Sequence, residues 1–179
     1  MAKNLCSILD GVPYEGRVTL STITKNGKKV ELAGYNHALP KLSEVFARAM
    51  CGYDVSSSIP RYLMAKQGSS EVNILNHPVL LTGTNYSVDD TTYYYVSYNA
   101  LITDSMLATV AGVTGNVYLF LLDSENNELA KIALVGNEEQ PVTDLSTLVG
   151  EGKNLLINWR LRLTNSNNYD NPGGNNGSL

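Results

Sequence analysis

The stretch "NLLINWRLRLTN", residues 154–165, alternates between apolar and polar positions. The apolar residues of one parity are Leu155, Ile157, Trp159, Leu161 and Leu163. The polar residues of the other parity are Asn158, Arg160, Arg162 and Thr164. Because successive side chains of a strand point to opposite faces, this alternation predicts a strand with one buried and one solvated face. The pattern ends in "SNNYDNPGGNNGSL", residues 166–179, which we expect to be a flexible tail.

Several preceding segments also read as strands. Residues 91–103 are rich in Tyr and Val, with Tyr94, Val96, Tyr98, Ala100 and Ile102 on one parity. Residues 116–123, "NVYLFLLD", are apolar on both parities, as in a central strand covered on two sides. Further strands are expected at 59–68, 78–88 and 128–134, with a polar turn at 124–127 and a short helical turn within 141–154. Short strands joined by turns predict a mainly β fold, either an antiparallel β-sandwich or a barrel. Of the two we expect the β-sandwich, of jelly-roll or Ig-like type.

Residues 17–35 contain Asn26-Gly27, a dipeptide typical of a two-residue hairpin turn. Pairing the flanking residues around that turn sets Ile23 opposite Val30 and Leu20 opposite Ala33. In this register the apolar residues divide between both faces, so the hairpin prediction rests on the turn rather than on the register.

One helix is predicted, at residues 40–51. A buried stripe at helical spacing consists of Leu42, Val45, Phe46, Ala49 and Met50. Pro40 suits the first turn and Gly52 suits the stop. Glu44 and Arg48 form an i, i+4 pair on the other side. We expect the stripe to pack on the strands and Cys51 to be packed as well.

Length and charge narrow the possible classes. The 179 residues favour a single domain at 17–165, which includes the hairpin and the helix, between an N-terminal arm at 1–16 and the tail at 166–179. The formal net charge is −4 and basic residues are scattered, so no direct nucleic-acid binding is expected. No apolar run approaches the ~20 residues that span a bilayer, and no signal peptide is recognised. Cys6 and Cys51 form no metal motif and read as reduced thiols of a protein folded in the cytoplasm.

No arrangement of residues predicts catalysis, a cofactor site or a metal site. His37 and His77 lack a second ligand at metal spacing. Asp89 and Asp90 are adjacent, so on a regular strand they would point to opposite faces. We therefore expect a protein that is not an enzyme, and a small hydrolase using Asp89 or Asp90 is the most remote alternative.

Tyrosine is unusually frequent, with 11 residues against two Phe and one Trp. Tyr suits surfaces that bury a ring and keep its hydroxyl wet, although strand propensity alone also explains the run at 93–95. The candidate interface residues are Tyr93, Tyr95 and, in the tail, Tyr169. The two functional interpretations are a protein interface and a face on which sugar rings stack.

Four segments in their order along the chain resemble the small virion structural proteins of tailed bacteriophages. These segments are "NHALPKLSEVFARAMCG", "SSSIPRYLMAKQGSS", "GNVYLFLLDSENNELAKIAL" and "LLINWRLRLTN". The resemblance covers residues 36–165, but the lead into the hairpin, "TGNVYLF", departs from the family's usual pattern and residues 10–35 have no counterpart. It implies a β-sandwich that works by assembling, without catalytic residues.

We therefore expect a structural component of a phage particle that folds in the host cytoplasm and resides in the virion. Its partners would be copies of itself and other virion proteins of the capsid, collar or tail. The alternative is a carbohydrate-binding module that recognises a host surface glycan.

Overall fold

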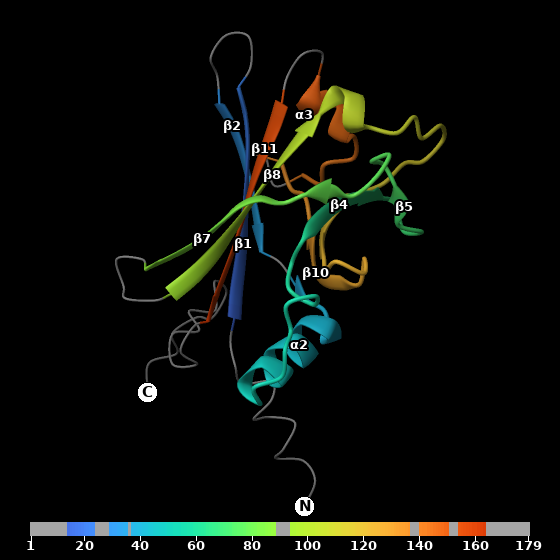
Figure 1. Ribbon diagram of the computed structural model, residues 1–179. Helices are drawn as coiled ribbons and strands as arrows, with labels where there is room; N and C mark the ends of the chain where they lie inside the picture. The colour runs from blue at the N-terminus through green and yellow to red at the C-terminus, as the bar shows by residue number, and fades with distance from the viewer. Residues whose placement is uncertain are drawn as a thin grey trace, which may run out of the picture.

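The computed structural model describes residues 14–23, 29–35, 37–88, 94–136, 140–150 and 154–163. The described chain is mainly β, with two antiparallel sheets and few helices (Figure 1). The strand order of the first sheet is β2 (Lys29–Tyr35), β1 (Tyr14–Ile23), β11 (Asn154–Leu163), β8 (Tyr94–Thr103) and β7 (Thr82–Val88). The order of the second sheet is β3 (His37–Ala38), β10 (Glu128–Ala133), β9 (Val117–Leu122), β4 (Tyr62–Gln67) and β5 (Val72–Asn73), and β6 (Val79–Leu80) also pairs with β4. The helices are α2 (Pro40–Met50), α3 (Leu145–Val149) and the 3₁₀ turn η1 (Asp104–Met106).

The predicted alternation of the closing strand is confirmed. In β11, Leu155, Ile157 and Trp159 are buried, whereas Arg160 is exposed. β11 lies in the middle of the first sheet, between β1 and β8, and Trp159 has no exposed surface. One hydrophobic cluster contains buried side chains from both sheets, so each sheet shields the inner face of the other.

The prediction for 116–123 is also confirmed, because β9 is the middle strand of the second sheet and both of its faces are covered. Leu119 and Leu121 face the shared core. On the other parity Phe120 is fully buried, and the ammonium groups of Lys66 and Lys131 lie 4.5 and 5.4 Å from its ring centroid. Long lysine side chains cover apolar surface in this way while their charged ends stay near water. Ala130 and Ile132 of β10 and Leu134, directly after it, are buried as the sequence predicted, and Leu129 on the other parity is buried as well.

The predicted register of the first hairpin is wrong by one residue. β1 ends at Ile23, which pairs with Lys29, and Leu20 pairs with Leu32 rather than with Ala33. Five residues therefore separate the paired ends, which excludes the register that a two-residue turn would set. Leu20 is also opposite Ile157 of β11, so the observed register aligns three apolar positions across the sheet. Asn26-Gly27 itself lies outside the described residues.

The helix is confirmed, and its end has a clear local cause. Pro40 occupies the first turn. Gly52, at φ +79°, ends the helix: its N–H donates to Ala49 O and the N–H of Tyr53 donates to Arg48 O, both at 3.0 Å. This pair of bonds is a Schellman motif, which needs a residue that tolerates positive φ.

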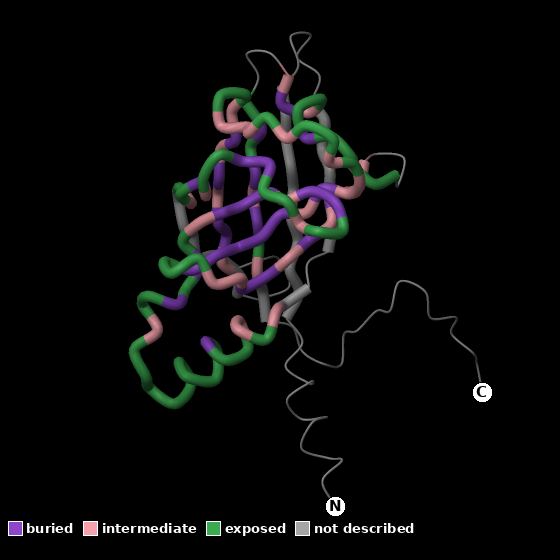
Figure 2. Tube along the Cα trace, turned by 90° about the vertical axis from the view of Figure 1, so that its right-hand side faces the viewer, coloured by how far each residue is buried: buried purple, intermediate pink, exposed green. Residues whose placement is uncertain are grey.

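The expected burial of the helix is mostly wrong. α2 contacts β3 and β10, and of the predicted stripe only Val45 is buried, with Leu42 half-buried. Figure 2 shows α2 at one end of the molecule with most of its residues exposed. Cys51, expected to be packed, is exposed. β3 has only two residues and β10 has six, so these two strands offer too little surface to cover a whole apolar stripe.

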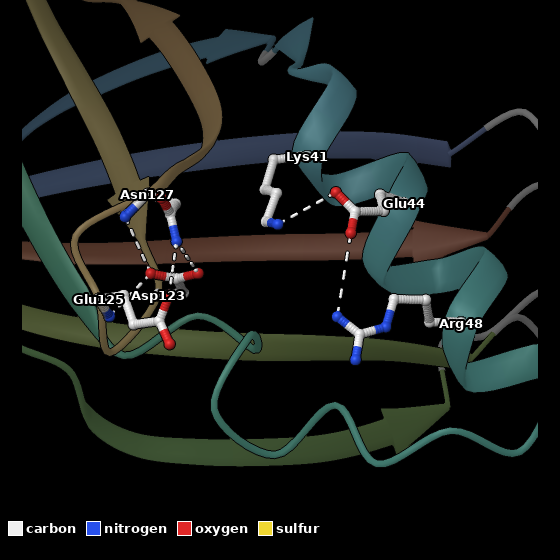
Figure 3. A network of polar contacts seen from close by, with 6 residues as sticks. All are labelled: Lys41, Glu44, Arg48, Asp123, Glu125 and Asn127. Atoms are coloured by element: carbon white, nitrogen blue, oxygen red, sulfur yellow. Dashed lines mark hydrogen bonds and ion pairs between the residues drawn. The ribbon is translucent and has the colours of Figure 1, made fainter.

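The turn at 124–127 depends on Asp123, which precedes it and is 1% exposed. Its carboxylate accepts hydrogen bonds from the backbone N–H of Glu125 at 2.9 Å and of Asn127 at 2.8 Å, and from the Asn127 amide at 2.8 Å (Figure 3). An aspartate that satisfies the N–H groups of the next residues is typical of such turns. The short helix within 141–154 is confirmed as α3, whose start is capped by Asp144.

Candidate interaction surfaces

The first sheet has two long edges that differ in chemistry. At one edge, β2 carries Lys29 and Glu31, lies in contact with β10, and is followed at once by β3 of the second sheet. At the other edge, β7 reads "TGTNYSV", has no charged residue and pairs with β8 on one side only. The edges of the second sheet are strands of two residues. We call β7 the open edge, because among the described edges it is the one without charge, shortness or a neighbouring sheet to protect it.

The open edge has one protective irregularity, a register shift between Thr82 and Thr84. From Thr84 to Val88 the pairing with β8 is regular. A β-bulge bends an edge strand locally, so this protection is confined to Thr82–Thr84.

The predicted interface tyrosines lie partly in this region. Tyr95 belongs to β8 and is opposite Ser87 of the open edge and Arg162 of β11. Tyr93 and Tyr169 lie outside the described residues, so Tyr95 is the one of the three that the structure describes. On β8, Tyr98 and Ala100 are buried on the predicted side, and Tyr95 falls on the opposite parity, with Ser97 and Asn99. The position of Tyr95 is therefore one strand away from the open edge.

The parity that Tyr95 shares carries a polar network in the centre of the first sheet. The Asn158 amide donates to Asn99 Oδ1 at 2.7 Å and to Ser97 Oγ at 3.4 Å, and Arg160 Nε donates to Asn158 Oδ1 at 3.2 Å. These side chains satisfy one another across β8 and β11. The network accordingly fixes the register of the two strands and shows no grouping that suggests catalysis.

A second surface is the apolar end of α2. Met50 is 75% exposed, Tyr53 65% and Phe46 37%. Phe46 and Met50 are one turn apart on the same side of the helix, and Tyr53 follows directly after its end. We call these three residues the α2 face. On the opposite side Glu44 accepts from Lys41 at 3.0 Å and lies 3.9 Å from Arg48, which confirms the predicted i, i+4 pair (Figure 3).

The outer face of the second sheet carries charged side chains, and lysine ammonium groups lie over its aromatic rings. Lys131 lies 4.4 Å from the centroid of Tyr118 and pairs with Glu71, and Lys66 pairs with Glu128. An ammonium over a ring is an attractive cation–π contact. A sugar that stacked on Tyr118 would have to displace Lys131.

The structure also contains a pocket of about 630 Å³ between α3 and the segment that follows η1. Its lining combines apolar residues with Gln67, Thr143 and Asp144. The Gln67 amide donates to the carbonyl oxygen of Thr143, and Asp144 Oδ1 accepts from the N–H and hydroxyl of Ser146 at 2.9 and 2.7 Å. Gln67 and Asp144 therefore form hydrogen bonds with other lining residues of the pocket. No aromatic side chain is found among its described lining residues.

The described residues contain no group of three or more His, Cys, Asp or Glu side chains that would hold a metal ion. His77 is an exposed loop residue, and His37 lies in β3 opposite Lys131. Asp89 and Asp90 fall outside the described residues. Within the described part of the chain, no helix has both the length and the apolar character to cross a membrane.

Comparison with known proteins identifies no relative: no family model, curated protein or solved structure matches this chain.

What the sequence missed at these surfaces is the order of the strands. The composition of residues 82–88 shows an uncharged strand, but its place at an edge follows only from the strand order, in which β8 is the one described strand that pairs with β7. The exposure of Phe46 and Met50 likewise depends on which strands lie near α2. The one available signal was the absence of charge along β7.

Proposed function

We propose that this chain is a non-enzymatic structural subunit of a tailed-phage virion that works by assembling with copies of itself and with other virion proteins. The resemblance of residues 36–165 to small phage structural proteins suggests the particle. The open edge is the observation that supports assembly, because a long strand with one unpaired side is suited to pairing with a strand of another chain.

The chemistry of the open edge supports this proposal. From Thr84 to Val88 the strand is regular, uncharged and free of proline, so its outward N–H and C=O groups are aligned for a further ladder. Pairing between two β7 strands would join two five-stranded sheets into one and would oppose no like charges. Such pairing would place Tyr95 of each subunit one strand from the new contact.

We further infer that the two sheets form a β-sandwich of the jelly-roll type. The strand pairs are nested along the chain: β7 with β8 lies inside β4 with β9, then inside β3 with β10, and finally inside β1 with β11. A chain that doubles back along its length in this manner favours the jelly-roll over the Ig-like arrangement.

The edge mechanism is tested with a lysine, the residue that proteins use to protect edge strands. Asn85→Lys places the charge on β7, and Ala33→Lys is the matched control on β2, the opposite edge. Light scattering over a range of concentrations would measure the molar mass of each variant against the 19.4 kDa monomer. We expect association of the native chain, its loss in Asn85→Lys, and its retention in Ala33→Lys. Equal association of all three would refute the edge mechanism.

The role in the particle requires a separate measurement. We expect mass spectrometry of purified particles of the encoding phage to find this chain at a fixed ratio to the major capsid protein. Particles that lack it would overturn the virion assignment whatever the state of the isolated subunit.

The second candidate function is a carbohydrate-binding module, and the observation that favours it is the exposed ring of Tyr53, which is 65% accessible. Exposed rings are common sugar platforms, but they also suit protein contacts. A glycan array probed with the native chain and with Tyr53→Ala distinguishes the two: binding that Tyr53→Ala abolishes would favour the module, and no binding by the native chain would remove it.

A further inference from the structure

We propose that the α2 face is the binding site of residues 1–13 of the same chain, which would lie on it as a short amphipathic helix. The α2 face and the open edge are formed by different elements, so this contact is separate from the proposed assembly. The occupant is suggested by three properties of residues 1–13: their apolar spacing, their reach and their point of attachment.

The spacing matches a helix with one apolar side. Leu5, Ile8, Leu9 and Val12 follow the i, i+3, i+4, i+7 pattern, and Gly11 and Pro13 suit the end of such a helix. An isolated helix of this length is marginal in water, because its nucleation is not repaid by enough hydrogen bonds. It therefore needs an apolar surface against which to form.

The α2 face is a surface of the required kind. Phe46 and Met50 lie in the C-terminal half of α2 and Tyr53 follows its end; Met50 and Tyr53 are largely exposed, and Phe46 is exposed over about a third of its surface. Three large apolar side chains in succession form a strip of the sort that receives a second helix through i and i+4 anchors. Burying the four apolar side chains of residues 1–13 against this strip would offset the cost of ordering the short helix, which one buried side chain could not do.

The reach and the attachment point also fit. Residues 1–13 lead directly into β1, which begins at the same end of the molecule as α2 (Figure 1). Thirteen residues span roughly 45 Å when extended, whereas α2 is only about 16 Å long. Attachment to the same chain makes the encounter intramolecular, with an effective concentration in the millimolar range. The C-terminal residues 166–179 hold few apolar side chains and are a poorer occupant.

The two cysteines of the native chain can report this contact. One lies within residues 1–13 and the other lies beside the α2 face. Cys6 lies within residues 1–13, and Cys51 is exposed at the end of α2, next to Met50. Cys6 adjoins Leu5 of the apolar side, so binding would place the two thiols in the same contact.

The test uses the full chain and oxidised glutathione. We expect a Cys6–Cys51 disulfide in a product of monomeric mass on a non-reducing gel, identified by peptide mapping, with Cys51→Ser as the control that cannot form it. Ile8→Asp, on the apolar side, should slow its formation about tenfold, and the neighbouring Ser7→Asp should not. A covalent dimer as the main product would overturn binding within one chain and would assign the α2 face to a second copy.

Hydrogen exchange of the α2 amides provides a readout that does not depend on thiol geometry. In the full chain, Ile8→Asp should increase exchange of the last two turns of α2 about tenfold, whereas Ser7→Asp should leave it unchanged. On α2 itself, Met50→Asp should reproduce the effect of Ile8→Asp on disulfide formation, and Ala47→Asp, also an exposed position, should not. Identical exchange in the native chain, Ile8→Asp and Ser7→Asp would refute the proposal.

Discussion

The strand β11 and the helix α2 carry apolar patterns of equal regularity, yet their apolar residues have opposite environments. Trp159 of β11 has no exposed surface, while Met50 of α2 is 75% exposed. β11 has a strand on each side and a second sheet across the core, whereas α2 has its main contacts within the described residues with β3 and β10. The spacing of apolar residues thus determines which element forms, and the number of neighbouring elements determines whether its apolar side is buried.

The largest expected effect is at the buried end of this comparison. Trp159→Ala should lower the free energy of unfolding by about 3–5 kcal/mol, because it leaves a large cavity between the two sheets. Chemical denaturation measures the change. Trp159→Phe is the control, since it keeps most of the apolar volume and removes the indole Nε1–H, which is buried without a hydrogen-bond acceptor among the described residues. A loss below about 1 kcal/mol for Trp159→Ala would mean that the core can close around the cavity.

The same contrast explains how much could be predicted from the sequence. The elements β9, β11, α2 and α3 follow from periodicity and local signals such as Gly52 and Asp144, because those signals act over a few residues. The Ile23–Lys29 register depends on how β1 also pairs with β11, a contact more than 100 residues away along the chain.

The interaction surfaces were less predictable for the same reason. Tyr95 could be selected from composition, but its position beside the open edge depends on the order of strands. The strands β3 and β5 have two residues each, too few to show an alternation of apolar and polar residues in the sequence. Exposure of the α2 face could not be inferred, since an apolar stripe looks the same whether or not a partner covers it.

A second test of the buried region uses pH. Burial raises the pKa of Tyr98, which pairs with Trp159 across the sheet, to about 12. Tyrosine in the unfolded chain ionises near 10, so the unfolded state loses its proton first as the pH rises. The contribution to stability is complete below about pH 10, and it is lost at up to about 1.4 kcal/mol per pH unit as the pH approaches 12. Denaturation at several pH values should show this fall in the free energy of unfolding between pH 10 and 12, and Tyr98→Phe should remove the part of the fall that Tyr98 causes. An unchanged slope in Tyr98→Phe would contradict a buried phenol.

Two glycines with nearly equal φ angles allow the cost of an added Cβ to be compared at the end of α2 and in the interior. Gly52, at φ +79°, ends α2 and has nothing within 4 Å of an added Cβ. Gly68, at φ +75°, follows β4, and an added Cβ would lie 3.1 Å from the carbonyl oxygen of Thr114. Gly52→Ala should therefore lose only the left-handed preference, about 1 kcal/mol, and Gly68→Ala about 2 kcal/mol because a contact is added. Equal losses would mean that the segment containing Thr114 moves aside without penalty.

The smallest expected effect concerns the polar side of α2. Glu44 has two cationic neighbours, Lys41 and Arg48, but all three side chains are between 33% and 50% exposed. Water screens such pairs and their long side chains lose freedom on pairing, so Glu44→Gln should lower the free energy of unfolding by less than about 0.5 kcal/mol. The difference should vanish near 1 M salt, where the Debye length is only about 3 Å. A loss above 1 kcal/mol that persisted in high salt would show that this side of α2 is packed against something. The side of α2 that carries Glu44 would then be a packed side. The α2 face would be the one exposed part of the helix to compare with the buried side of β11.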